Sequence, residues 1–84
     1  MKPIDFIKEN YPDSIVLIGF DDAIIGVTPD DNVIYDFTTM VDLLMMSDRS
    51  MTREDAHEWL QYNTVRSLPY MTEGPAPVIM YAIN

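Results

Sequence analysis

Cysteine is missing from this 84-residue chain, and histidine occurs only once. Without a thiol, the protein can form neither a disulfide nor a thiolate nucleophile or metal ligand, and this composition fits a reducing compartment. A hydrophobic content of 48% over 84 residues suffices for one small core. We therefore expect a single domain over residues 1–84.

Long apolar runs are also missing. Runs such as IVLI at residues 15–18 fall far short of the ~20 residues that a membrane-spanning helix needs. The first stretch, MKPIDFIKEN, carries Asp5 and has no apolar segment of signal-peptide length. These features predict a cytoplasmic protein without a membrane partner.

Basic residues are few. Five Lys and Arg oppose 14 Asp and Glu for a formal charge of −9, and residues 9–48 contain no Lys or Arg at all. Such a surface disfavours direct binding to nucleic acid. Either the charge simply keeps a small protein in solution, or it forms an acidic face that docks on a basic partner such as a nucleic-acid-binding enzyme. The candidate residues of that face are Asp21, Asp22, Asp30 and Asp31.

Motifs for catalysis and metal binding are lacking as well. HEWLQ at residues 57–61 approaches the zinc-protease pattern, but Gln61 stands where the second histidine is required. The adjacent Asp30 and Asp31 lack the alternation and the glycine of a calcium loop. The glycines are too scattered to cradle a phosphate. We expect no enzyme activity, no metal site and no cofactor.

The apolar pattern predicts an α+β fold. Residues 3–10 are typical of a short helix that ends before Pro12. β-Branched runs at residues 14–20, 23–28 and 32–37, separated by turn residues, predict three strands of an antiparallel meander. Residues 78–83 predict a final strand that joins the same sheet.

Both faces of this meander are expected to be apolar. The predicted register places Gly26 between Leu17 and Tyr35, so that the missing side chain leaves room for the Tyr35 ring. Because so small a domain has too little helix to cover both faces, the second one meets another copy of the chain or a ligand. We favour a homo-oligomer. The predicted faces contain Ile24, Gly26, Val33 and Tyr35 on one side, and Ile25, Val27 and Ile34 on the other.

Two longer helices complete the prediction. Asp36 is a favourable N-cap for a helix over residues 37–47. Thr52 caps the next helix, which should run from Arg53 to about Arg66, with Asp55 making an imperfect capping box. The predicted fold is a three- to four-stranded antiparallel sheet packed against two main helices and a short N-terminal helix.

Polar and aromatic residues gather near the end of the second long helix. Counting back from Asn63 by four and three residues reaches Trp59 and Ala56, which places Asn63 on the face that the helix buries. There its amide would satisfy backbone groups of the proline-rich loop. Alternatively, the cluster binds a ligand or a partner. The candidate binding residues are Trp59, Tyr62, Asn63, Arg66, Tyr70, Thr72 and Glu73.

The stretches DDAIIGV, VIYDFTTMVDLLM, MTREDAHEWLQYNT and APVI, within residues 20–79, form a further pattern. In these stretches the chain resembles a family of small, mostly uncharacterised bacteriophage and prophage proteins. MTEGPAPV departs from the shorter Gly-Glu turn of that family. The resemblance implies a phage-encoded accessory protein in the cytoplasm of a host cell. It rests on Asp22, Ala23, Gly26, Tyr35, Asp36, Met51, Thr52, Ala56, Tyr62, Asn63, Glu73 and Pro77.

Three functions follow as hypotheses. The first is a non-enzymatic protein that inhibits a host component by protein–protein contact, such as an anti-CRISPR-type inhibitor of a nucleic-acid-binding defence effector. The second is an oligomer that sequesters a nucleotide immune signal near Asn63, Arg66 and Tyr70. The third is a nucleotide hydrolase with carboxylate ligands such as Asp36 and Glu73.

Overall fold

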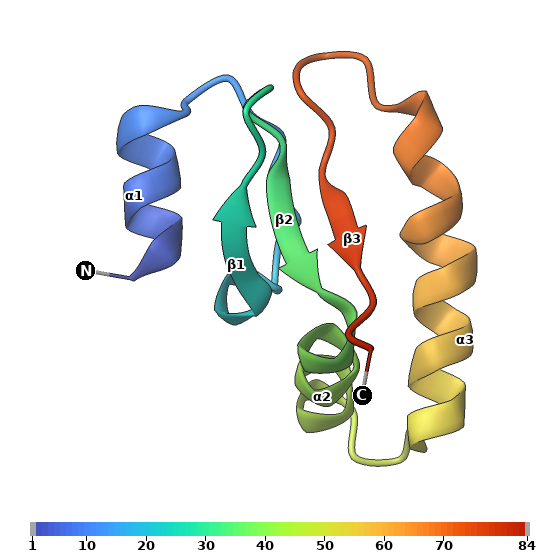
Figure 1. Ribbon diagram of the computed structural model, residues 1–84. Helices are drawn as coiled ribbons and strands as arrows, with labels where there is room; N and C mark the ends of the chain where they lie inside the picture. Colours follow the sequence, from blue (N-terminus) through green and yellow to red (C-terminus); the bar gives the residue numbers. More distant parts are fainter. Residues whose placement is uncertain (1, 84) are drawn as a thin grey trace.

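The computed structural model describes residues 2–83 and has the expected α+β fold, with two main helices and a short N-terminal one (Figure 1). Every helix within these residues is too short or too polar to cross a lipid bilayer. The elements are α1 (Pro3–Asn10), η1 (Asp21–Ala23), β1 (Ile24–Val27), β2 (Val33–Asp36), α2 (Phe37–Ser47), α3 (Arg53–Asn63), η2 (Val65–Tyr70) and β3 (Val78–Met80).

The sheet has the order β1-β2-β3 and is mixed. β1 and β2 form the expected antiparallel hairpin, whereas β3 runs parallel to β2, with Tyr35 beside Ile79. This corrects the prediction of a purely antiparallel sheet. The reason lies in the connection: α3 carries the chain back to the end where β2 began, so β3 must run in the same direction as β2 (Figure 1). β3 is also shorter than predicted and ends at Met80.

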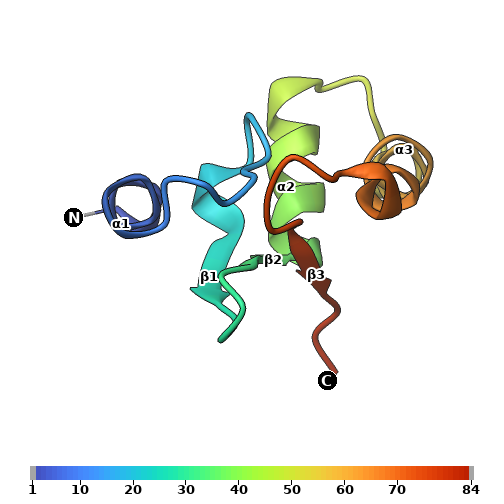
Figure 2. The ribbon, with the colours of Figure 1, turned by 90° about the horizontal axis from the view of Figure 1, so that it is seen from above.

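Residues 14–20 do not form the predicted strand. They form an irregular segment that crosses the sheet on the side of α2 (Figure 2). Individual hydrogen bonds hold this segment, and it does not pair with a strand in a β-ladder. The Leu17 amide donates to the Tyr35 hydroxyl at 2.8 Å, and the Ile15 amide donates to the Pro75 carbonyl at 3.1 Å. Burial raises the pKa of the Tyr35 phenol above 10.0, and the bond from Leu17 opposes that rise.

The register of the hairpin also differs from the prediction. Ile24 pairs with Tyr35 and Gly26 pairs with Ile34, so Ile25 is an extra residue in a β-bulge. Gly26 therefore does not lie beside Tyr35. The bulge exchanges the faces of the residues that follow it: Gly26 joins Ile34 on one side, and Val27, which packs against the core, joins the other.

All three helices leave one face of the sheet uncovered (Figure 2). α2 lies behind the sheet, α1 lies beside β1, and α3 packs against α2 and crosses it. The core fills the space between the sheet and these helices. Its buried apolar residues are Ile4, Ile7, Ala23, Ile24, Val33, Tyr35, Phe37, Met40, Val41, Ala56 and Leu60.

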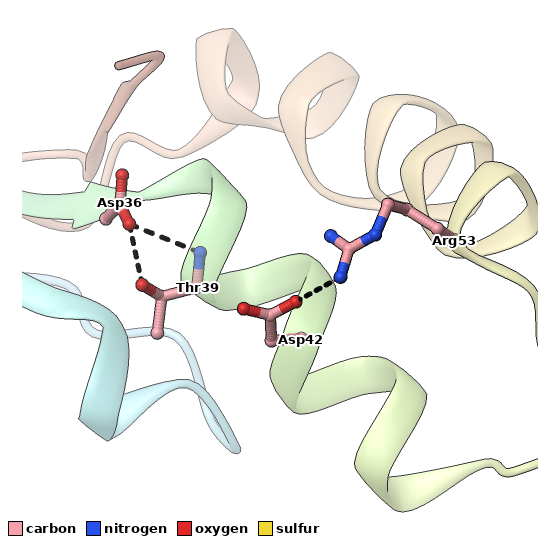
Figure 3. Close-up of polar contacts among 4 residues, drawn as sticks. All are labelled: Asp36, Thr39, Asp42 and Arg53. Carbon is pink, nitrogen blue, oxygen red and sulfur yellow. Dashed lines mark hydrogen bonds and ion pairs between the residues drawn. The ribbon is translucent and has the colours of Figure 1, made fainter. Parts of the chain in front are cut away.

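Side-chain caps fix the first turns of both main helices. The Asp36 carboxylate accepts from the amide and the hydroxyl of Thr39, at 3.2 and 2.6 Å, as expected of an N-cap (Figure 3). Thr52 and Asp55 form a complete capping box, which corrects the expected imperfect one, because an aspartate at the third position also reaches the N-cap amide, at 3.2 Å.

The exposed ion pair between Asp42 on α2 and Arg53 on α3, at 2.7 Å, links the two helices near the loop that joins them (Figure 3).

α3 is rotated relative to the prediction and ends earlier. Its buried positions are Ala56 and Leu60, and Thr64 directly after it is buried as well, whereas Trp59 and Asn63 are exposed. The Asn63 side chain donates to the Trp59 carbonyl at 2.9 Å, within its own helix. The proposed burial of Asn63 is therefore wrong. The helix ends at Asn63, three residues before Arg66, because η2 begins at Val65 and contains Pro69.

Candidate functional site

Three loops that are distant in sequence meet at one end of the molecule, the upper end in Figure 1. They comprise residues 11–15, 28–32 and 71–77, and together we call them the loop end. Ser14 donates its hydroxyl to the Asp31 carbonyl at 2.6 Å, which joins the first loop to the second. The side-chain amide of Asn32 donates to the Ala76 carbonyl at 2.8 Å, which joins the second loop to the third.

The second loop is a compact turn whose shape is set by its own sequence. Thr28 and Asn32 are joined through both their backbones and their side chains. The backbone amide of Asn32 donates to the Thr28 hydroxyl at 3.0 Å, and that hydroxyl donates to the side-chain oxygen of Asn32 at 2.8 Å. Asp31 has a φ of 67°, a conformation that Asp and Asn tolerate better than most residues. The turn therefore presents Asp30 and Asp31 in a fixed arrangement.

The first and third loops touch at Gly74. A Cβ atom there would lie well inside contact distance of the Asp13 carbonyl oxygen, so only glycine permits this approach. The backbone bond from Ile15 to Pro75 closes the same contact. Together with the bonds of Ser14, these contacts hold all three loops as one unit.

The loop end is acidic. Each loop contributes at least one exposed carboxylate, and none of the three contains Lys or Arg. Like charges gathered in one region produce a negative potential that attracts basic groups over several ångströms. No set of three acidic, histidine or cysteine side chains within residues 2–83 is arranged to hold a metal ion. The four carboxylates are those of Asp13, Asp30, Asp31 and Glu73.

The acidic face expected from the sequence is divided in two. Asp30 and Asp31 follow β1, whereas Asp21 and Asp22 lie in η1, which precedes it, so the two pairs are at opposite ends of the strand (Figure 1). Asp21 and Asp22 instead share a shallow hollow with Lys2. The lysine balances part of the charge there, which leaves the loop end as the acidic surface without a basic residue.

The seven candidate binding residues also fall into two groups. Tyr70, Thr72 and Glu73 line a small hollow with Ile15 at the loop end, and Tyr70 is 83% exposed. The structure thus places these three residues at the same end of the molecule as Asp30 and Asp31. Sequence reasoning missed Asp13, Ser14, Asn32 and Gly74 at this site, and the only local signals for them were turn residues at separate places in the chain.

The other four candidates, Trp59, Tyr62, Asn63 and Arg66, lie on the outer side of α3 and the start of η2. The Arg66 guanidinium lies over the Tyr62 ring, 5.5 Å from its centroid. Tyr62 and Arg66 line a groove of about 940 Å³ that also includes Arg53 and His57. Since every lining residue belongs to α3 or η2, this is an open depression along one helix and not an enclosed pocket.

Comparison of the chain with protein-family models, with curated proteins and with solved structures finds no match. The interpretation of the site therefore rests on its own chemistry.

Proposed function

We propose that this protein is a non-enzymatic inhibitor that binds a positively charged surface of another protein through its loop end. The observation that supports this function is the joining of four exposed carboxylates from three hydrogen-bonded loops. The resemblance of its sequence to small bacteriophage and prophage proteins implies that this inhibitor is encoded by a phage. Its target is then a host component such as a nucleic-acid-binding defence effector of the CRISPR type.

A fixed acidic surface suits this task for two physical reasons. Because the loops are already held together, little conformational freedom is lost when a partner binds. A protein that binds nucleic acid must carry a basic groove, and carboxylates can occupy the positions that phosphates take in it. The exposed Tyr70 ring, beside Glu73, adds the type of side chain that most often anchors protein interfaces.

The test compares two variants with the same change in charge. Asp30→Asn/Asp31→Asn neutralises the loop end, and asparagine keeps the positive φ at position 31 tolerable. The matched control, Asp21→Asn/Asp22→Asn, removes the same charge at the far end of β1. Each tagged protein is used to capture proteins from bacteria that carry a CRISPR effector, and binding to the purified captured protein is then measured at low and high salt.

The first variant should lose the partner while the control retains it, and binding should weaken with added salt. Equal binding by both variants would exclude the loop end as the contact. A parallel assay follows CRISPR interference against a plasmid in living cells. There the parent and the control should restore transformation, and the loop-end variant should not.

Sequestration of a nucleotide signal is a second candidate, and the stacked pair of Tyr62 and Arg66 favours it. A base could stack on the ring, and the guanidinium could bind a phosphate. Tyr70 lines a separate hollow, so the site would comprise the α3 groove alone. Calorimetry with cyclic nucleotides tests it: heat that disappears in Arg66→Ala supports sequestration, and no heat with the parent protein rejects it.

A further inference from the structure

The uncovered face of the sheet carries a small apolar surface. From the strand register, Gly26, Ile34 and Val78 form one row across this face, and Met80 lies beside Asp36 in the next. Val78 and Met80 are each 39% exposed, and Ile25 in the bulge is 52% exposed. In a small domain one face of the sheet packs on the core, and the face that meets solvent is normally polar. An apolar row on the second face therefore indicates that something covers it.

The charge on this face is low. Asp36 is the single charged residue in the rows, and its carboxylate is already bound to Thr39 at the start of α2. A chain with a net charge of −9 repels its own copies through most of its surface. Two copies that meet at the uncovered face avoid most of this repulsion, because the face carries few carboxylates.

The exposed area of the whole molecule is large for a monomer of this mass. The chain exposes 5759 Å², whereas a folded monomer of 9.7 kDa is expected to expose about 5100 Å². The excess is therefore about 600 Å², close to the ~800 Å² that each partner buries in a standard interface. The excess is a property of the whole molecule, and it is of the size that association with a second copy would bury.

We propose that a second copy of this chain covers the face, giving a two-fold symmetric dimer in which the two sheets pack against each other. In such an interface the same residues lie on both sides, so Val78 and Met80 of each copy would contact the apolar rows of the other. The loop end lies at the ends of the strands and not on this face (Figure 1). The dimer would consequently carry two acidic loop ends, both accessible to partners.

The mass of the protein in solution tests the proposal. Val78→Glu/Met80→Glu places two carboxylates on the face. The matched control, Ile18→Glu/Met46→Glu, makes the same exchange at two exposed residues outside the rows, 95% and 74% exposed. Sedimentation equilibrium should give the parent and the control about twice 9.7 kDa at micromolar concentration, and the first variant 9.7 kDa.

A monomeric parent protein at all concentrations overturns the proposal, and so does a dimer that survives the Val78→Glu/Met80→Glu exchange. Circular dichroism establishes that each variant is folded. If the double variant does not fold, Gly26→Glu replaces it, because a Cβ at Gly26 meets only the end of Ile34 at an ordinary 3.9 Å. A folded Gly26→Glu protein that remains dimeric also overturns the proposal.

Discussion

Removal of the Tyr35 hydroxyl should loosen the segment that crosses the core in place of a strand. The Tyr35 ring is completely buried, and its oxygen accepts the Leu17 amide at 2.8 Å. Tyr35→Phe keeps the ring and leaves no large cavity, but the Leu17 amide loses its partner. A backbone donor left without a partner in a partly buried position costs about 1–2 kcal/mol.

Urea unfolding measures this loss. With a slope of about 1 kcal/mol per molar urea for a chain of this size, the midpoint should fall by about 1–2 M. Tyr70→Phe is the control, since that ring is 83% exposed and should leave the midpoint unchanged. Hydrogen exchange at the Leu17 amide should accelerate in Tyr35→Phe only. An unchanged midpoint, with unchanged exchange at Leu17, would refute the role assigned to this bond.

The same residue gives the protein a signature at alkaline pH. Because burial raises the pKa of Tyr35 above 10.0 in the folded state, the folded protein holds this proton more tightly than the unfolded chain. The contribution of the protonated Tyr35 to the stability of the fold is complete below the pKa of Tyr35 in the unfolded chain. It is lost as the pH rises through the pKa of Tyr35 in the folded protein. The free energy of unfolding should therefore decline above about pH 10 in the parent and decline less in Tyr35→Phe. An identical decline in both proteins would contradict this assignment.

Three further substitutions test other contacts of the fold by urea unfolding. Gly74→Ala should destabilise the protein by separating the loops at the Asp13 carbonyl, whereas Gly26→Ala should have little effect; equal midpoints would contradict the close approach. Thr52→Ala removes the α3 cap and should cost about 1 kcal/mol, and a loss near zero would mean that the capping box contributes nothing. Met40→Ala creates a cavity at a fully buried position and should cost about 2–5 kcal/mol, which a surface-like loss would refute.

The sequence predicted those elements whose ends are marked by local chemistry. Pro3 and Asp36 identified the starts of α1 and α2, and the turn before Val33 identified the hairpin. Residues 14–20 were mistaken for a strand because a β-branched run indicates extended chain but not a partner. In this protein the hydrogen bonds of that run go to a side chain and to a distant loop.

The errors at the candidate site have similar causes. Both possible faces of α3 contain Ala56, and the apolar pattern could not distinguish the one through Trp59 and Asn63 from the one through Leu60 and Thr64. Residues of the loop end were identified only in part, because its three loops are distant in sequence. The contacts that join them, such as the one between Asn32 and Ala76, depend on the parallel position of β3.

That parallel strand determines when the loop end is assembled during synthesis. β3 can pair with β2 only after α2 and α3 have emerged from the ribosome and turned the chain back. The third loop follows α3 and η2, so Pro75 and Ala76 meet the first two loops at the same late stage. A nascent chain that already holds most of the acidic residues therefore still lacks the assembled loop end. The partner binding proposed for the loop end should begin only once the segment through Met80 has been made and docked.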